Sequence, residues 1–348
     1  MLTPLKNSYC VLVYPSKRAL VNKKNSNNIH SVQVKITITM ISHRVKVQEK
    51  DSGKRIDILV SEKTGVTRSQ MQRLIKGGLL LVDSRTVSQN YRVKAGDVIV
   101  LTAEDKKHEQ LIPEAIPVEI LYMDRSLVVV NKPAGMVVYP AAGHSRGTLM
   151  NALLCRCKKL EAPGGPLRPG VVHRLDKDTS GVMVVALDSG AYYKLAEQFK
   201  QRTINRRYVA LIYGNPKDNS GQISLAIGRS ETDRKKMSTR VRRGKEALTI
   251  WKIIERFHGA ALIEAKLKTG RTHQIRVHFA SIGHPVLGDR AYGKKIEIET
   301  REREKLTFPR QMLHAEALGF IHPVTGKYLE FHSPPPDDMA ERIKQLRG

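Results

Sequence analysis

The segment GVVHRLDKDTSG, residues 170–181, combines carboxylates and basic side chains between two glycines. A carboxylate such as that of Asp176 is a competent nucleophile at a sugar anomeric carbon or an electron-poor ring carbon, and a covalent intermediate divides one difficult substitution into two easier steps. A neighbouring guanidinium, here Arg174, keeps such a carboxylate ionised and fixes its direction. Ordinary glycosidases use two carboxylates, but one is enough when the leaving base stays in the site and is reattached. The segment therefore suits glycosidic chemistry on an anionic polymer.

Two other interpretations of this segment compete. It could be a turn before the strand VMVVALD, with Thr179 and Ser180 capping backbone groups. The spacing of Asp176 and Asp178 also resembles the nucleophile motif of an aspartyl-phosphate phosphatase. That chemistry needs an apolar strand running into the first Asp and further carboxylates for Mg²⁺. Arg174 interrupts the approach, and the later Gly-Asp pair is followed by RAYGKK without an acid, so we reject the phosphatase.

The composition favours a nucleic-acid partner. Among 348 residues, 60 Lys and Arg stand against 33 Asp and Glu, which gives a formal net charge of +27. Such a balance favours a polyanion, and the sequence has no 18-residue apolar run that would indicate a membrane. Neither the three cysteines nor the spacing of His273 and His278 matches a metal site. We expect no metal, no cofactor, no membrane, and a cytoplasmic location with reduced thiols.

Short strands are predicted to dominate the chain after about residue 118, and GMVVYP at 135–140 is one of them. They do not alternate evenly with helices, which favours a mixed, largely antiparallel central sheet with flanking helices over a doubly wound parallel sheet. RRYVALIYG predicts a strand that carries Tyr208. HQIRVHFASIG has apolar residues at helical spacing, which places Arg276 near the beginning of a helix. We expect an α+β chain with a catalytic domain over residues 118–348.

Residues 40–101 predict a smaller α+β domain. RSQMQRLIKGG has the apolar spacing of a helix that ends at a glycine pair. The basic residues opposite its apolar side are Arg68, Arg73 and Lys76. With the later segment VKAGD, this pattern resembles the S4 RNA-binding domain, although a solvated charged face is an alternative. The S4 family usually shows Asn-Gly at the hairpin where this chain has Asp83-Ser84.

The remaining segments are predicted to lie outside both domains. Residues 102–117 are charged and contain two prolines, which is typical of a linker. Residues 1–39 contain basic residues, no acid and no sustained period. We interpret them as an atypical basic extension, either disordered or the product of a mis-called start with Met40 as the true first residue. A transit peptide would be amphipathic and richer in Arg.

The segment HRLDKDTSG, residues 173–181, resembles the nucleophile motif H-R-L-D-x-x-T-S-G of the RluA-type pseudouridine synthases, which isomerise uridine in RNA. Other blocks of this family occur in order along the chain. They are NKPAGM at 131–136, RYVA at 207–210, GRTHQIRVH at 270–278, LGD at 287–289 and LHA at 313–315. Tyr139 stands where many members have His. The resemblance runs from about 118 to 335 and implies the pseudouridine synthase fold.

The resemblance also implies residue roles. Asp176 would be the nucleophile, Tyr208 would stack on the uracil and help proton transfer, and Arg276 would pair with Asp176. Arg174 would occupy the space of the target base, which must leave its stack to be reached. Without the motif, Tyr208 would be ordinary sheet packing and Arg276 a surface arginine. Whether Asp176 attacks C1′, assists formation of a glycal or adds to C6 of the base stays open.

Several basic segments predict where RNA binds. The loop at 228–247 is rich in Lys and Arg and offers a phosphate-binding surface besides the S4-like helix, so binding should weaken with salt. A solvated loop is the alternative. The RNA-binding residues that we expect are Arg174, His173, Arg271, Gln274, Arg68, Arg73, Lys76, Arg234, Lys235 and Lys236.

The tandem of S4 and RluA-type domains is most similar to the large-subunit rRNA pseudouridine synthase D branch of the family. We therefore expect a monomeric isomerase whose partner is large-subunit (23S-type) ribosomal RNA or a ribosomal precursor particle. One alternative is a pseudouridine synthase acting on tRNA. Another is a non-catalytic RNA-binding factor in ribosome assembly, against which the intact Asp176, Tyr208 and Arg276 speak.

Overall fold

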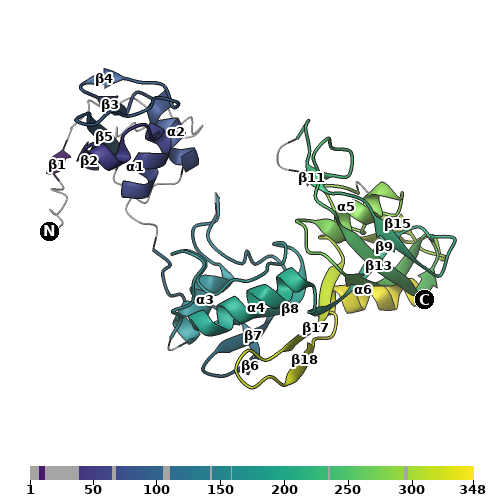
Figure 1. Cartoon of the computed structure of the whole chain (residues 1–348). Coiled ribbons are helices and arrows are strands. Elements are labelled where there is room, and N and C mark those ends of the chain that lie inside the picture. Colours follow the sequence, from purple (N-terminus) through teal and green to yellow (C-terminus); the bar gives the residue numbers. More distant parts are fainter. Residues whose placement is uncertain are drawn as a thin grey trace, which may run out of the picture. The chain divides into compact units, whose positions relative to one another are not determined.

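The computed structural model describes residues 8–11, 39–64, 68–104, 110–141, 143–157, 159–233, 236–293 and 297–348. For residues 8–11, 39–43, 68–70 and 103–104 it describes the backbone alone. The chain divides into two compact units, Met1–His108 and Glu109–Gly348 (Figure 1), and each is described by itself.

The first unit is a small antiparallel sheet with two helices. Its elements are β1 (Ser8–Val11), β2 (Thr39–Lys46), the 3-10 turn Glu49–Asp51, α1 (Ile56–Thr64), α2 (Arg68–Lys76), β3 (Leu80–Val82), β4 (Arg85–Thr86) and β5 (Val98–Glu104). The strand order is β1-β2-β5-β3-β4. Apolar residues of α1 and α2, among them Leu59 and Met71, pack on Ile99 and Leu101 of β5 in one core. Asp83 and Ser84 form the β3–β4 turn with positive φ angles of 46° and 67°, which Asn-Gly adopts more easily.

The second unit is built on one sheet of nine strands. The strands are β6 (Glu119–Met123), β7 (Leu127–Lys132), β8 (Ser180–Ala186), β9 (Asn205–Tyr213), β10 (Ser220–Ser224), β13 (Leu248–Phe257), β14 (Ala260–Leu267), β17 (Leu313–Ile321) and β18 (Tyr328–His332). Their order is β10-β13-β14-β9-β17-β8-β7-β6, with β18 paired to β17. β8 and β17 run parallel, whereas β7 with β8 and β9 with both β14 and β17 run antiparallel.

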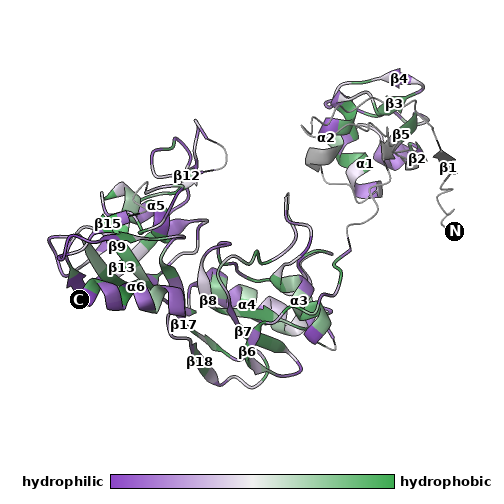
Figure 2. Ribbon diagram, turned by 180° about the vertical axis from the view of Figure 1, so that it is seen from behind, coloured by the Kyte–Doolittle hydropathy of each residue, from purple (hydrophilic) through white to green (hydrophobic). Residues whose placement is uncertain are grey.

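Helices cover both faces of this sheet. They are α3 (Leu149–Arg156), α4 (Ser189–Gln201), α5 (Gln274–Ser281) and α6 (Asp337–Arg347). Because side chains alternate along a strand, Tyr208 and Ala210 of β9 join the core with α3 and α5, whereas Val209 and Leu211 pack with α6. Val129 of β7 packs with α4. Figure 2 shows hydrophobic residues concentrated on the strands and mixed with hydrophilic ones on α4 and α6.

Two short hairpins extend the second unit beyond the main sheet. The first pairs β11 (Gly228–Arg229) with β12 (Met237–Ser238) inside the basic loop 228–247. The second pairs β15 (Glu297–Glu299) with β16 (Lys305–Thr307).

The α+β class and the mixed, largely antiparallel sheet predicted from the sequence are confirmed. The expectation of a further strand at GMVVYP, residues 135–140, is wrong, because that segment forms turns and irregular backbone. The carbonyls of Val137 and Val138 accept hydrogen bonds from the amides of Leu149 and Met150 at the beginning of α3. The apolar run therefore caps a helix instead of joining the sheet.

The predicted domain boundaries stay predictions. Within the linker at 102–117, Glu114 donates its amide to the carbonyl of Asn151 in α3, and the Asn151 side chain donates to the carbonyl of Ile112. Of the extension at 1–39, the structure describes β1, which pairs with β2, and the beginning of β2 itself. The rest of that extension lies outside the described residues.

Gly181 generates a prediction about stability. It has a φ of 118° at the point where β8 pairs with β17, and a Cβ there would fall inside the backbone of Ala315. We expect Gly181→Ala to lower the free energy of unfolding by about 3 kcal/mol or more, from clash and backbone strain together. Urea unfolding of the variant measures this. Gly326→Ala is the matched control, because its φ is 71° and nothing lies within 4 Å. Equal losses in the two variants would contradict the clash.

Candidate active site

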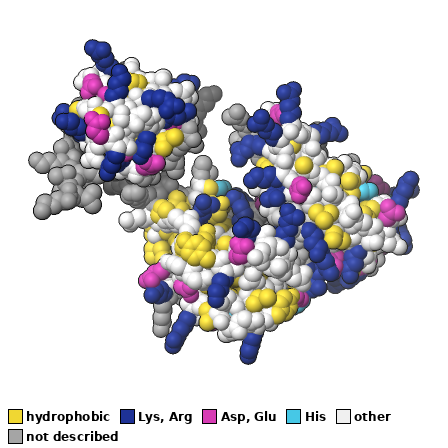
Figure 3. Space-filling model, viewed as in Figure 1, with side chains coloured by type: hydrophobic (Ala, Val, Ile, Leu, Met, Phe, Trp, Pro, Cys, Tyr) yellow, Lys and Arg dark blue, Asp and Glu magenta, His cyan; other side chains and the backbone are white. Residues whose placement is uncertain are grey.

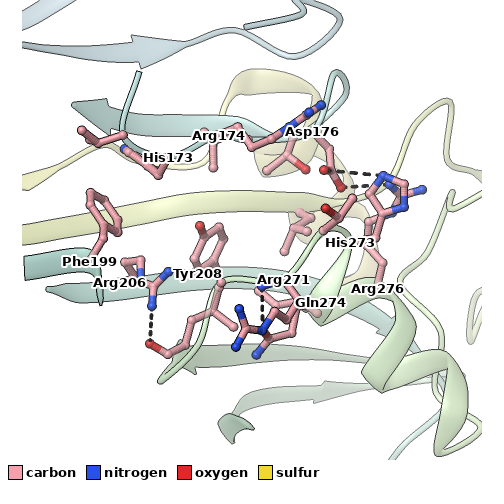
Figure 4. A pocket seen from close by; sticks show the side chains of 18 of the residues that line it. His173, Arg174, Asp176, Phe199, Arg206, Tyr208, Arg271, His273, Gln274 and Arg276 are labelled. Carbon is pink, nitrogen blue, oxygen red and sulfur yellow. Dashed lines mark hydrogen bonds and ion pairs between the residues drawn. The ribbon is translucent and has the colours of Figure 1, made fainter. Parts of the chain in front are cut away.

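A cavity of about 400 Å³ opens on the sheet face that carries Tyr208. It is lined by the loop before β8, by β9, by the beginning of α5 and by the loop that precedes α5. Figure 4 shows Asp176, His273 and Arg276 at one end, Phe199 and Arg206 at the other, and Tyr208 between them. The three residues predicted to be catalytic, Asp176, Tyr208 and Arg276, thus share one cavity.

Arg276 binds two carboxylates at once. Its Nε and one terminal nitrogen donate to Asp289 at 2.7 and 2.9 Å, and its other terminal nitrogen donates to Oδ2 of Asp176 at 2.9 Å. The side chain of Asp289 is fully buried and also accepts the amides of Ala291 and Tyr292. Burial alone would lower the pKa of Arg276. The hydrogen bonds and the charges of Asp289 and Asp176 outweigh burial, so the pKa of Arg276 is raised. Asp289 therefore fixes the plane of the guanidinium and leaves one edge for Asp176.

His273 stands beside Asp176 without forming a hydrogen bond to it. Its Nε2 lies 3.7 Å from Oδ1 of Asp176, and its Nδ1 is 2.6 Å from the Tyr292 hydroxyl. Burial lowers the pKa of His273, so the ring is neutral at pH 7. Its backbone has a φ of 57°, unusual for a residue with a side chain, where the chain enters α5. The charge opposite Asp176 is therefore that of Arg276.

The backbone of the loop that carries Asp176 is held by side chains from other elements. The buried ammonium of Lys132 donates to the carbonyls of Lys177, Pro133 and Met136 at 2.7 to 3.1 Å. Burial lowers the pKa of Lys132 to about 7, against the charges of Asp176 and Asp178. Arg310 donates to the carbonyl of Asp178 at 3.0 Å and pairs with Asp338 of α6.

Two further side-chain pairs hold the end of the same loop. Gln311 donates to the Thr179 hydroxyl at 2.8 Å, and the Ser180 hydroxyl lies 2.9 Å from Nδ1 of His314. These four polar side chains are buried. The loop is thus tied to β17 and the segment before it, so the nucleophile candidate sits on rigid backbone.

Tyr208 and Arg206 line the cavity from the same face of β9. Tyr208 is 8% exposed, and burial raises the pKa of its phenol, which therefore stays protonated at neutral pH. The Arg206 guanidinium lies 5.6 Å from the centre of the Phe199 ring and donates to the carbonyl of Leu267 at 3.3 Å. A flat base above Tyr208 would lie between Asp176 and Arg206.

Arg174 lies at the mouth of the cavity and is exposed. It donates to the Tyr139 hydroxyl at 2.9 Å, with its guanidinium 5.3 Å from the centre of that ring. Arg168 lies over the same ring at 5.8 Å. Tyr139 therefore holds two cations at the cavity entrance.

The other predicted RNA-binding residues of the cavity differ in how many of their polar atoms are already hydrogen-bonded within the protein. His173 accepts the Val184 amide at its Nε2, 3.1 Å away, and stacks on Phe199. The Gln274 amide is engaged by Thr269, by the Arg271 amide, and by the backbone of Leu248 and the hydroxyl of Thr249. We therefore interpret Gln274 as shaping the loop before α5, and its RNA-binding role stays a prediction. Arg271 is half-buried, with its Nε bonded to the Glu246 carbonyl.

The remaining predicted RNA-binding residues belong to α2 and to the basic loop 228–247. Arg73 and Lys76 are exposed on α2, and only the backbone of Arg68 is described. Lys236 is half-buried beside Asp233 in the β11–β12 hairpin, whereas Arg234 and Lys235 lie outside the described residues. Figure 3 shows many Lys and Arg side chains on the face it presents, including the region of this hairpin.

Sequence reasoning assigned no role to several residues that the structure brings to the site. Asp289 and Lys132 stood in recognised blocks, LGD and NKPAGM, so a signal for both existed. The sequence suggests His273 only as a metal ligand, and its spacing from His278 does not fit a metal site. Arg206 gave no signal, because an Arg beside another Arg at a strand end is ordinary.

Among the described residues, the helices are too short or too polar to span a membrane.

Comparison with known proteins matches both parts of the chain. The family model described as RNA pseudouridylate synthase matches residues 126–281, and that of the S4 domain matches residues 54–99. The RNA pseudouridine synthase YlyB of Bacillus subtilis is 42% identical over 304 residues, which cover 87% of this chain and 97% of that protein. Ribosomal large subunit pseudouridine synthase D of Zymomonas mobilis is 42% identical over 312 residues, 88% of this chain and 98% of that protein.

A solved structure is similar as well. Human RNA Pseudouridylate Synthase Domain Containing 1 superposes with a TM-score of 0.50 at 28% identity, over 68% of this chain and 96% of that chain. The region matched to the synthase family contains Asp176, Tyr208 and Arg276, and the S4 match contains α2.

His173 generates a prediction about pH. Burial lowers its pKa from 6.5 to about 3, and protonation of Nε2 would break its bond with the Val184 amide. The unfolded chain therefore takes up this proton first as the pH falls, so stability present above pH 6.5 is lost progressively toward pH 3. The loss is at most about 1.4 kcal/mol for each pH unit. His173→Gln keeps an acceptor but does not titrate. Urea unfolding between pH 7 and 4.5 should show a smaller loss in this variant, and equal losses would refute the assignment.

Proposed function

Because this chain belongs to the RNA pseudouridine synthases, we propose that it isomerises uridine to pseudouridine in large-subunit ribosomal RNA, with Asp176 as the nucleophile. The family, its fold and the S4 domain, all predicted from the sequence, are confirmed. The protein is an isomerase whose substrate is RNA. The observation that carries the assignment of Asp176 is its carboxylate, held 2.9 Å from Arg276 inside the cavity that Tyr208 lines.

The proposed reaction exchanges one glycosidic bond for another. The N1–C1′ bond breaks, the uracil turns within the cavity, and C5 forms a bond to C1′. The hydrogen on C5 leaves as a proton, and N1 gains a proton, so the product is an isomer of the substrate. Asp176 can attack C1′, assist formation of a glycal or add to C6 of the base, and each route uses the same carboxylate.

The cavity supports distinct roles for its side chains. The Arg276 pair stabilises the Asp176 carboxylate and directs it toward the space above Tyr208. Tyr208 offers a ring on which the uracil stacks and a protonated phenol for proton transfer. Because the target atoms are inaccessible in a stacked helix, the nucleotide must flip into the cavity. Arg174, exposed at the entrance, is placed to occupy the vacated space.

Ribosomal RNA is the substrate that the relatives favour. The Zymomonas relative is named for the large ribosomal subunit and matches nearly its whole length. Exposed Arg73 and Lys76 on α2, and the basic hairpin of β11 and β12, offer phosphate-binding surfaces. The choice of large-subunit rRNA or its precursor particle over tRNA, action as a monomer, and a cytoplasmic location are parts of the same proposal.

The decisive test is release of tritium from RNA labelled at uracil C5, because that hydrogen leaves only when C5 becomes the glycosidic carbon. We expect release from large-subunit rRNA by the wild type and none by Asp176→Asn, since an amide is no nucleophile here. The variant should bind the RNA with unchanged affinity. Asp178→Asn, two residues away, is the matched control and should retain activity.

Two other results of the tritium assay would change the proposal. Tritium release from tRNA and not from rRNA would show that tRNA, and not large-subunit rRNA, is the substrate. No release from free RNA or assembled subunits, with binding intact, would favour the RNA-binding assembly factor.

A further inference from the structure

Arg206 is a buried cation without a carboxylate partner. Its side chain is 8% exposed, and its Nε has no hydrogen-bond partner. Burial lowers the pKa of Arg206, and among the residues that the structure describes no carboxylate forms an ion pair with it. Arg276, at the other end of the cavity, pairs with two carboxylates. Arg206 and Arg276, two of the arginines that line the cavity, thus differ in whether a carboxylate neutralises their charge.

The Arg206 guanidinium occupies space that is free because residue 270 is a glycine. A Cβ on Gly270 would lie 2.5 Å from a terminal nitrogen of Arg206 and 3.7 Å from its Cζ, so a residue with a side chain at 270 would displace the guanidinium. Phe199 covers the guanidinium from 5.6 Å, and the Leu267 carbonyl accepts one of its N–H groups. The cation is therefore held in place at the end of the cavity away from Asp176.

Such an arrangement is costly for the folded protein. A buried charge without a counter-charge destabilises a fold, and its replacement by an apolar residue of similar size is often neutral or stabilising. The cost is offset if a ligand brings negative charge to the cavity. Arg206 lies two residues before Tyr208, and both line the cavity from the same face of β9. A base stacked on Tyr208 would therefore lie on the same side of the sheet as the Arg206 guanidinium.

We propose that Arg206 is a catalytic residue that stabilises the negative charge on the uracil while the N1–C1′ bond is exchanged. This inference rests on the proposed function. When N1–C1′ breaks, the bonding electrons stay on the base and spread over N1 and its two carbonyl oxygens. The same is true of glycal formation, and addition to C6 also places negative charge on the ring. A fixed guanidinium is suited to each route, because a preorganised charge needs no rearrangement as the reaction proceeds.

The first test separates catalysis from folding. Arg206→Met should lower the single-turnover rate of C5 tritium release by about 10²-fold, without weakening RNA binding or lowering the unfolding midpoint. Arg206→Lys should recover part of the rate. Arg207→Met is the matched control: Arg207 is the next residue of β9, faces the other side of the sheet and pairs with Glu316 at 2.8 Å. It should keep the wild-type rate.

The second test changes the base instead of the protein. RNA with 5-fluorouridine at the target position carries a more acidic base, which needs less help to hold negative charge. Because C5 then carries fluorine and has no proton to lose, the rearranged base closes by adding water across N1 and C6, and the reaction is followed by mass spectrometry as loss of 5-fluorouridine from the digested RNA. This loss should slow by a smaller factor in Arg206→Met than the reaction of uridine does. A structural defect would slow both by the same factor.

Four results would overturn the inference. The first is an unchanged rate in Arg206→Met, and the second is a loss confined to RNA binding. The third is an equal loss with both bases and an unchanged unfolding midpoint, and the fourth is the same equal loss with a lowered midpoint. If the wild type releases no tritium, the proposed function fails and the inference fails with it, whereas an active wild type with an equally active Arg206→Met removes the inference alone.

Discussion

The shared ion pair of Arg276 is the interaction on which the site depends. A carboxylate in a partly closed cavity needs a counter-charge, and a guanidinium among protein atoms needs several acceptors. Asp289 takes two N–H groups of Arg276 in a bidentate pair, and Asp176 takes a third. Because Asp289 is itself fixed by the amides of Ala291 and Tyr292, the direction of the remaining N–H is set before any substrate enters.

The sheet brings Asp176 and Arg276, the two partners of this ion pair, close together. Asp176 lies on the loop that leads into β8, and the absence of a side chain at Gly181 lets the backbone of Ala315 come close where β8 pairs with β17. Arg276 comes from the first turn of α5, which packs through Phe279 on the same face of the sheet as Tyr208. Lys132 and Arg310 then hold the carbonyls of the Asp176 loop. The positive φ of Gly181 and the buried polar groups thus fix the position of the Asp176 loop.

The sequence predicts a residue's position where a contiguous block or a helical spacing carries it, and does not predict it where the position depends on strand register. The HRLDKDTSG block pointed to Asp176, and helical spacing placed Arg276 near the beginning of α5. Arg206 and Arg207 are identical neighbours in sequence, and alternation along β9 alone places one in the cavity and the other with Glu316. The run at 135–140 has strand composition, but its carbonyls are used by α3, a tertiary contact that no local pattern indicates.

We expect Asp289 to act on the Asp176 carboxylate only through Arg276. A double-mutant cycle of single-turnover rates for the wild type, Asp289→Asn, Arg276→Lys and the double variant tests this. If the account is correct, each single change slows pseudouridine formation, and the double variant is no slower than Arg276→Lys. Losses that multiply in the double variant would contradict it, because Asp289 would then act by a route that does not pass through Arg276.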